Sequence, residues 1–267
     1  MKSKRYSSLI RAGILESLQF KGSLIFTFVG NLFYLLLIYY LWKAIFASSD
    51  SDVINGMTFS YTMIYLVFAT ALFNFMEMWI VWNIGRDIQS GQIVIDLLKP
   101  VGFRSLTFFR GCGELIIKFV TTFLPTAIVV AFISDGAIVF GKNILFFILS
   151  VILGLFINFY INFFVATVCM YTETIWGINI MTEVIIGLLS GAAVPLAFFP
   201  KTFKKIVMFL PFQAICNSPM ELLLHNEYSL SQEFTIIAVQ AFWVVFLMIA
   251  TDLFFRFSVK RITVNGG

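Results

Sequence analysis

Long apolar blocks alternate with short polar segments along this chain, and each block is about as long as a membrane-spanning helix. A helix rises 1.5 Å per residue, so about 20 apolar residues cross the ~30 Å hydrocarbon layer of a bilayer. The pattern predicts six spans with little charge inside them. We place these spans at residues 22–42, 61–82, 115–133, 146–170, 177–199 and 234–254.

The segment before the first span is basic and carries apolar residues at helical spacing. These are Leu9, Ile10, Ile14, Leu15 and Leu18. Such a pattern is typical of an amphipathic helix that lies in the plane of the membrane interface. A signal peptide is the alternative, but the apolar run comes late and lacks a small-x-small cleavage site. We therefore predict an interfacial helix over residues 1–21.

The segment between the second and third spans is unusually polar for a chain of this kind. Residues 83–103 have the sequence NIGRDIQSGQIVIDLLKPVGF. Unpaired backbone groups cost several kcal/mol each in hydrocarbon, so this segment must lie outside the bilayer core. A short helix is expected between Gly91 and Pro100, because the residue before a proline is pushed out of the helical region. We predict a surface helix that is available to a partner protein.

Residues 200–233 form neither a plain span nor a plain loop. Two stretches with apolar residues at helical intervals lie on either side of Pro211, and neither is long enough to cross a bilayer. We predict two short re-entrant helices on the external face, packed over the end of the fifth span. An ordinary amphipathic surface loop is the alternative.

Composition places the whole chain in the membrane class. The 267 residues are 60% hydrophobic and 12% charged, whereas a soluble domain has about 25% charged residues. The sequence therefore predicts an all-α integral membrane protein with one transmembrane domain over residues 1–267. The net charge of +4 is small and gives no reason to expect nucleic acid as a partner.

The distribution of basic residues predicts the orientation of the spans. With six spans and a cytoplasmic N-terminus, 13 of the 18 lysines and arginines fall on the cytoplasmic side. Positive charge is enriched in cytoplasmic loops of membrane proteins. We therefore expect both termini in the cytoplasm.

Catalytic and metal-binding patterns are weak. The sequence has one histidine, His225, and its three cysteines are far apart, so neither a nucleophile–base pair nor a His-based metal site is expected. Residues 136–143, GAIVFGKN, resemble a phosphate-binding loop but have Asn143 where a hydroxyl residue is needed. They also lie in a turn between two spans. The chain is therefore not expected to be an enzyme or to hydrolyse ATP itself.

Three acidic residues lie within the predicted spans, and ionisable groups in a bilayer are candidates for function. We expect Glu77 and Asp252 to lie near the membrane surface and to form local hydrogen bonds. Glu183 is deeper, on a helix with small residues that allow close helix packing. A subunit interface or a pathway wall is favoured there over a proton relay, since no second buried acid or histidine completes a relay. The candidate residues are Asn179, Thr182, Glu183, Gly187, Ser190 and Gly191.

Taken together, these parts resemble the permease subunit of an ABC-2 type ABC transporter. The resemblance covers essentially the whole chain: an interfacial helix, six spans, a helix between spans two and three, and short helices between spans five and six. Residues 87–100, DIQSGQIVIDLLKP, are similar to the I-x-x-G-x(4–5)-L-L-[RK]-P motif of one bacterial permease branch.

The resemblance implies a bacterial cell-membrane exporter driven by a separate subunit. Two copies of an ATP-binding subunit would hold ATP and Mg²⁺ and dock on the cytoplasmic helix, called the coupling helix. A second permease subunit, the same or different, would complete the pathway. The charged docking residues would set the register with the partner, and the Ile/Leu face would anchor the helix to the spans. The implied docking residues are Arg86, Asp87, Gly91, Asp96, Leu97, Leu98, Lys99 and Pro100.

Other functions remain open from the residues alone. An ATP-independent secondary transporter would show inverted repeats or matched broken helices, and the two halves of this chain show none. A membrane-embedded enzyme would need a convergent polar cluster. A non-transporting membrane partner, such as an immunity protein, is contradicted only by the docking segment.

Overall fold

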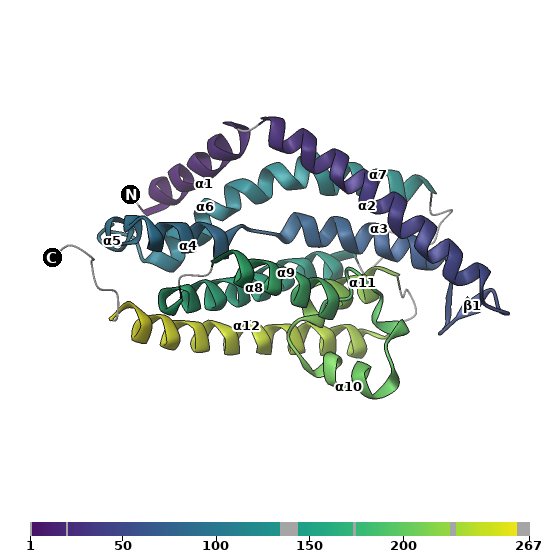
Figure 1. The fold of residues 1–267 in the computed structure, drawn as a ribbon. Coiled ribbons are helices and arrows are strands. Elements are labelled where there is room, and N and C mark those ends of the chain that lie inside the picture. Colours follow the sequence, from purple (N-terminus) through teal and green to yellow (C-terminus); the bar gives the residue numbers. More distant parts are fainter. Residues whose placement is uncertain (1, 20, 134–143, 173–174, 225–227, 261–267) are drawn as a thin grey trace.

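The computed structural model describes residues 2–19, 21–133, 144–172, 175–224 and 228–260. The phosphate-loop-like residues 136–143 and His225 lie outside this part of the chain. The described residues are almost entirely helical (Figure 1). The elements are α1 (Lys2–Gln19), α2 (Lys21–Ala47), β1 (Val53–Ile54), β2 (Met57–Thr58), α3 (Phe59–Met76), α4 (Ile80–Gln89), α5 (Gln92–Leu97), α6 (Phe103–Lys118), η1 (Phe119–Phe123), α7 (Leu124–Ile133), α8 (Ile144–Val168), η2 (Cys169–Tyr171), α9 (Ile175–Leu189), η3 (Leu196–Phe198), α10 (Lys201–Phe209), α11 (Gln213–Leu224) and α12 (Leu230–Val259).

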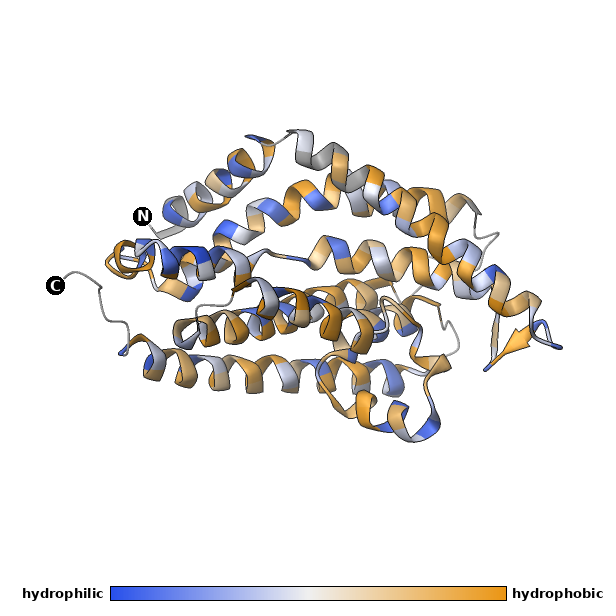
Figure 2. Cartoon of the chain, in the orientation of Figure 1, coloured by the Kyte–Doolittle hydropathy of each residue, from blue (hydrophilic) through white to orange (hydrophobic). Residues whose placement is uncertain are grey.

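Five helical segments of the described residues are long and apolar enough to cross a membrane. They are α2, α3 with α4, α6 with η1 and α7, α8 with η2, and α12. A sixth crossing of this kind would need α10 and α11 together, and these two helices are bent by 103°. The structure confirms the prediction of an all-α integral membrane protein. Hydrophobic residues dominate α8 and α12, whereas hydrophilic residues gather on α1, α4 and α6 (Figure 2).

The predicted second span contains a break. α3 ends at Met76, and α4 begins at Ile80 after a non-helical turn at Glu77. Buried Asn158 donates a hydrogen bond from Nδ2 to the Met76 carbonyl oxygen at 2.8 Å. This bond satisfies one of the backbone acceptors that the break leaves without a helical partner. α4 then continues to Gln89, so the first part of the polar segment is helical.

The predicted third span begins earlier than its hydrophobicity indicated. α6 starts at Phe103 and continues through a π-helical turn, η1, into α7. The resulting helix includes Arg104 and Arg110, which we expected in the connecting segment. π-helical turns are rare and often occur at functional sites.

The predicted fifth span is shorter than expected. α9 has 15 residues and ends at Leu189, so it is about 22 Å long and shorter than the ~30 Å hydrocarbon layer. Gly191 then adopts a φ of 85°, which favours glycine and ends the helix. A Cβ on Gly191 would lie 2.7 Å from the Tyr65 hydroxyl oxygen. The chain therefore turns well before the predicted end at Phe199.

Two short helices flank Pro211, and one of them is in the protein core. α10 has a single buried residue, Val207, while 11 of the 12 residues of α11 are buried. α11 packs against α8, where a Cβ on Gly154 would lie 2.9 Å from the Ile215 carbonyl oxygen. Glycine is needed at this position because the two backbones approach so closely. α11 is therefore an internal helix of the bundle.

α1 packs along α6 rather than standing apart from the bundle. A Cβ on Gly13 would lie 2.1 Å from the Arg110 carbonyl oxygen, and a Cβ on Gly113 would lie 2.4 Å from the Ile10 carbonyl oxygen. Two glycines thus allow the helices to cross in direct backbone contact. α1 starts, and α12 ends, at the same end of the molecule as α5 (Figure 1).

The opposite end of the molecule carries a small β-hairpin where we expected a polar loop. β1 and β2 are antiparallel and connected by Asn55 and Gly56, whose φ angles are 50° and 83°. Two positive φ values define the hairpin turn that Asn-Gly favours. This hairpin connects α2 to α3.

Candidate functional site

α5 is a short helix that two of its residues anchor to the bundle. Gly91 precedes it with a φ of 73°, a conformation that costs other residues roughly 1 kcal/mol or more. Ile93 is 1% exposed and belongs to the apolar core around α4 and α8. Asp96 is 4% exposed, and its Oδ1 lies 2.6 Å from Lys99 Nζ. The glycine therefore sets the direction of α5, and buried residues fix its position.

The outward face of α5 is apolar. Ile95 is 56% exposed and Leu98 is 80% exposed. We expected the charged residues Arg86, Asp87 and Asp96 to set the register with a partner and an Ile/Leu face to anchor the helix. Ile93 is buried as an anchor would be, but Asp96 is also buried, while Ile95 and Leu98 point outward. Helical spacing alone did not show which apolar face would be buried. Of the other predicted docking residues, Arg86, Gly91, Lys99 and Pro100 are exposed, and Asp87 and Leu97 are half-buried.

A cavity of about 520 Å³ lies directly behind this helix, between α1, α2, α4 and α6. Asp96 of α5 and Asp87 of α4 line one end of it. Asn31 and Asn74 line its other end and are hydrogen-bonded to each other at 3.2 Å. The cavity is therefore in direct contact with the segment that we predicted to dock a partner.

One face of α6 and η1 forms a wall along the length of this cavity. The lining residues run from Phe103 to Thr122, a distance of about 28 Å along a helix. They recur every three or four positions, as expected for a single helix face. The polar members are Thr107, Arg110, Glu114, Lys118, Thr121 and Thr122.

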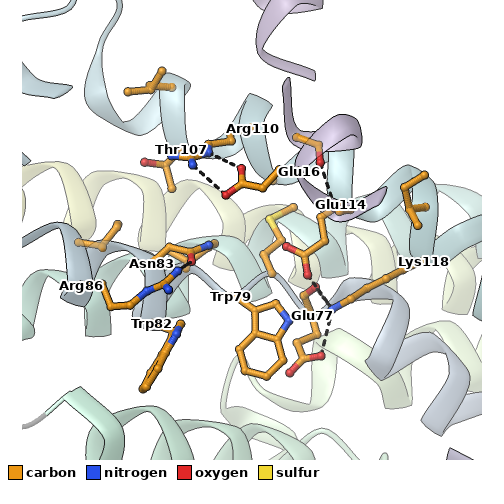
Figure 3. Close-up of a pocket in the computed structure, with 18 of the residues that line it drawn as sticks. Glu16, Glu77, Trp79, Trp82, Asn83, Arg86, Thr107, Arg110, Glu114 and Lys118 are labelled. Atoms are coloured by element: carbon orange, nitrogen blue, oxygen red, sulfur yellow. Dashed lines mark hydrogen bonds and ion pairs between the residues drawn. The ribbon is translucent and has the colours of Figure 1, made fainter. Parts of the chain in front are cut away.

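Two ion-pair clusters project into the cavity (Figure 3). Arg110 donates from Nε and Nη2 to the two carboxylate oxygens of Glu16, both at 3.0 Å. Lys118 Nζ lies 3.0 Å from Glu77 Oε2 and 3.0 Å from Glu114 Oε1. The first cluster links α1 to α6, and the second links the break after α3 to α6.

Two tryptophans complete the lining. The Lys118 Nζ lies 5.9 Å from the Trp79 ring centroid, and the Arg86 guanidinium lies 5.8 Å from the Trp82 ring centroid. Arg86 also donates a hydrogen bond to Asn83 Oδ1 at 3.0 Å. Indole faces attract cations at such distances. The cavity therefore combines carboxylates, cations and aromatic rings.

Sequence reasoning missed the central residues of this cavity. Glu16 and Glu114 received no role, Trp79 was interpreted only as an aromatic residue at the membrane interface, and Lys118 was counted only as a cytoplasmic positive charge. The spacing of Arg110, Glu114 and Lys118 on one helical face could have identified this wall. The opposing partner Glu77 lies 41 positions away from Lys118, and no pattern within one helix shows such a contact.

We expected Glu77 and Asp252 to form local hydrogen bonds. Instead, both form ion pairs with basic residues of α6. Glu77 pairs with Lys118, and Asp252 of α12 pairs with Arg104 near the start of α6. Both acidic residues therefore connect α6 to neighbouring helices.

The candidate residues around α9 face the interior of this chain. Asn179 Nδ2 donates a hydrogen bond to Glu183 Oε1, and the Asn217 amide donates to the Ser190 carbonyl oxygen at 2.9 Å. Asn179, Thr182, Gly187, Ser190 and Gly191 are buried, and Glu183 is half-buried. The exposed side of α9 is apolar and includes Trp176, Ile180, Met181, Val184, Ile185 and Leu188.

Comparison with known proteins decides the class of this molecule. Residues 32–266 match a family described as "ABC-2 family transporter protein". The chain belongs to this family. It is thus the membrane permease of an ABC-2 type transporter, as its resemblance indicated. No curated protein matches the chain. In this permease, Gly91 has a positive φ, and Leu98 is exposed at the end of α5.

Proposed function

We propose that this permease is driven by a separate ATP-binding subunit that docks on α5 at the cytoplasmic face. The observation that carries this proposal is the exposure of Ile95 and Leu98 on a helix fixed from behind by Ile93. Large apolar side chains exposed beside charged residues are typical of a protein-binding surface. In the complete transporter, two ATP-binding subunits hold ATP and Mg²⁺, and this chain is not catalytic.

The position of α5 supports a route from docking to the transport pathway. Asp96 is in α5 and lines the cavity, so a displacement of α5 changes the cavity wall directly. A partner that binds one conformation more tightly shifts the equilibrium by its differential affinity. ATP binding in the docked subunit would therefore change the shape of the cavity through α4 and α5.

The same proposal includes an exporter in the cell membrane with cytoplasmic termini and a second permease subunit, the same or different. The fold supports the orientation, because α1 starts and α12 ends at the same end of the molecule as α5 (Figure 1). The apolar faces of α2 and α9 are exposed in the single chain. Lipid and a second permease subunit would cover these faces.

Leu98→Ser tests the docking surface. We expect the variant to fold normally, because Leu98 is 80% exposed. Loss of a central apolar contact in an interface costs about 2 kcal/mol, which weakens binding about 30-fold. Co-purification of the ATP-binding subunit from native membranes and stimulation of its ATPase activity by the permease both measure this loss.

Gln92→Ser is the matched control, since Gln92 is exposed on the same helix but is polar. It should retain the partner and full ATPase stimulation. Normal co-purification with Leu98→Ser would contradict docking on α5. Purification of the wild-type chain without any ATP-binding protein would contradict the proposed function as a whole.

A further inference from the structure

The groups that surround the Lys118 ammonium are of the kind that would bind an organic cation. Two carboxylates lie 3.0 Å from it, and the Glu77 carbonyl oxygen accepts a hydrogen bond from it at 2.8 Å. The Trp79 ring lies on a further side, with its centroid 5.9 Å away. Carboxylates and an aromatic face are the groups that recognise organic ammonium ions. In this structure the cation is the side chain of Lys118, and its single positive charge faces two carboxylates.

The surrounding cavity is negative and large enough for a ligand. Its lining includes five carboxylates and three cationic side chains, and Lys99, which is outside the lining, pairs with one of the carboxylates, Asp96. Two of the three cations are already paired, Arg110 with Glu16 and Lys118 with Glu77 and Glu114. The volume of about 520 Å³ lies within the ~300–1,000 Å³ range of small-molecule sites. The charge balance of the lining therefore favours a cationic ligand over an anionic one.

Lys118 is also placed so that its side chain can move away. It is the last residue of α6, directly before the π-helical turn η1. Its ammonium is carried by a flexible four-carbon stem, and its side chain is 16% exposed. A change between α and π geometry at this turn would rotate the residues that follow it relative to those before it.

We propose that the cavity along α6 binds an organic cation, which replaces the Lys118 ammonium between Glu77, Glu114 and Trp79. Lys118 thus holds the site in the absence of ligand and balances one of the two negative charges. The inference deepens the proposed transport function by assigning a substrate class. Binding itself does not depend on ATP or on docking, so it can be tested separately.

The test uses the purified full-length chain in nanodiscs of zwitterionic lipid. Tetraphenylphosphonium and tetraphenylborate have nearly the same shape and opposite charge, and their binding is measured by calorimetry. The two ions are titrated separately, because they precipitate together, and empty nanodiscs give the partition of each ion into lipid. We expect saturable binding of tetraphenylphosphonium beyond its lipid partition and no such binding of tetraphenylborate. Saturable binding of both ions beyond lipid partition would overturn the proposal, because it would indicate binding driven by apolar surface alone.

Variants locate the site. Glu114→Gln and Trp79→Leu should each weaken tetraphenylphosphonium binding about tenfold, through loss of a carboxylate and of an aromatic face. Lys118→Met should strengthen it at least about threefold, since the competing ammonium is removed. Weaker binding in Lys118→Met would overturn the role of Lys118. Thermal melting verifies that each variant is folded. The comparison of the two ions on the wild-type chain tests the proposal even if a variant fails to fold.

Glu221→Gln is the matched control. Glu221 lines a second cavity of about 410 Å³ between the β-hairpin, α3 and α11, and accepts a hydrogen bond from Asn217. Its replacement should leave tetraphenylphosphonium binding unchanged, and an equal loss would place the site elsewhere. Cation binding without a coupled ATPase would contradict the proposed function alone. A coupled ATPase without cation binding would contradict this inference alone.

Discussion

The two sides of the helix bundle are held together by different interactions. On the packed side, formed by α8, α11 and α12, the buried Gln240 amide donates hydrogen bonds to the Ser150 and Ala214 carbonyl oxygens at 3.2 and 2.8 Å. On the cavity side, α1 and α6 pack in close backbone contact, but ion pairs surround a hollow between this helix pair and α2 and α4. Trp42 is the only buried residue in α2 among those whose burial is described.

This difference indicates which side can rearrange. Close-packed helices lose many contacts when they separate, whereas an exposed ion pair such as Glu16–Arg110 contributes only about 0–1 kcal/mol. A permease must open a pathway without unfolding. We therefore expect the packed side to act as a support and the cavity side to move.

The same substitution on each side tests this comparison most strongly. Gly154→Leu would force a side chain into the Ile215 carbonyl on the packed side, and Gly113→Leu would force one into the backbone of α1. Overpacking a rigid core costs about 1–3 kcal/mol or more. We expect Gly154→Leu to abolish folding or to lower the melting temperature strongly. Gly113→Leu should displace α1 while the rest of the bundle stays folded.

Limited proteolysis and thermal melting in detergent distinguish these outcomes. New cleavage after Gly113→Leu should be confined to the region of α1. Gly30→Leu is the control, because among the described residues no atom outside its own stretch of helix lies within 4 Å of the position of its Cβ. Equal loss of folded protein for Gly154→Leu and Gly113→Leu would contradict the comparison.

The apolar blocks predicted the long helices because membrane insertion depends on local hydrophobicity. α2, α8 and α12 each correspond to one apolar block of the sequence. The segment around Gly91 was also predictable, because its charges exclude it from hydrocarbon and its glycine and proline delimit a helix. These features require information from only about 20 neighbouring residues.

Features that depend on distant partners were not predictable in this way. α11 is as buried as a core helix although it contains Pro219, and it is covered by α8, some 60 residues earlier. The burial of Asp96 and the exposure of Leu98 likewise depend on the packing of α5 against other helices. The cavity is lined by residues of six helices, α1 to α6, and of the π-helical turn η1. Hydrophobic periodicity identifies an apolar face but does not identify what covers it.

Gln240→Leu tests the packed side with a smaller change. The variant loses two hydrogen bonds from Nε2, each with a net contribution of about 0.5–1.5 kcal/mol. It also removes Oε1, which has no hydrogen-bond partner among the described residues, so part of the loss is offset. We expect a net destabilisation of about 1 kcal/mol, measured as a lower melting temperature. Phe242→Leu serves as the control, because Phe242 is exposed on the same helix. Gln232→Leu is not suitable as a control, because Gln232 caps α12. An unchanged melting temperature would show that the amide does not support the packed side.

The smallest effect is expected for the ion pair between α1 and α6. The Glu16 and Arg110 side chains are 49% and 47% exposed, so water and salt screen their attraction. A double-mutant cycle of Glu16→Gln and Arg110→Gln isolates this interaction, since each single variant removes one charge of the pair. We expect a coupling free energy below about 1 kcal/mol that falls further in about 1 M salt. A coupling above about 2 kcal/mol that salt does not reduce would be typical of a dry, buried pair. In that case the pair would add firmly to the close packing of α1 on α6 at Gly13 and Gly113, and these two helices could move only as one unit.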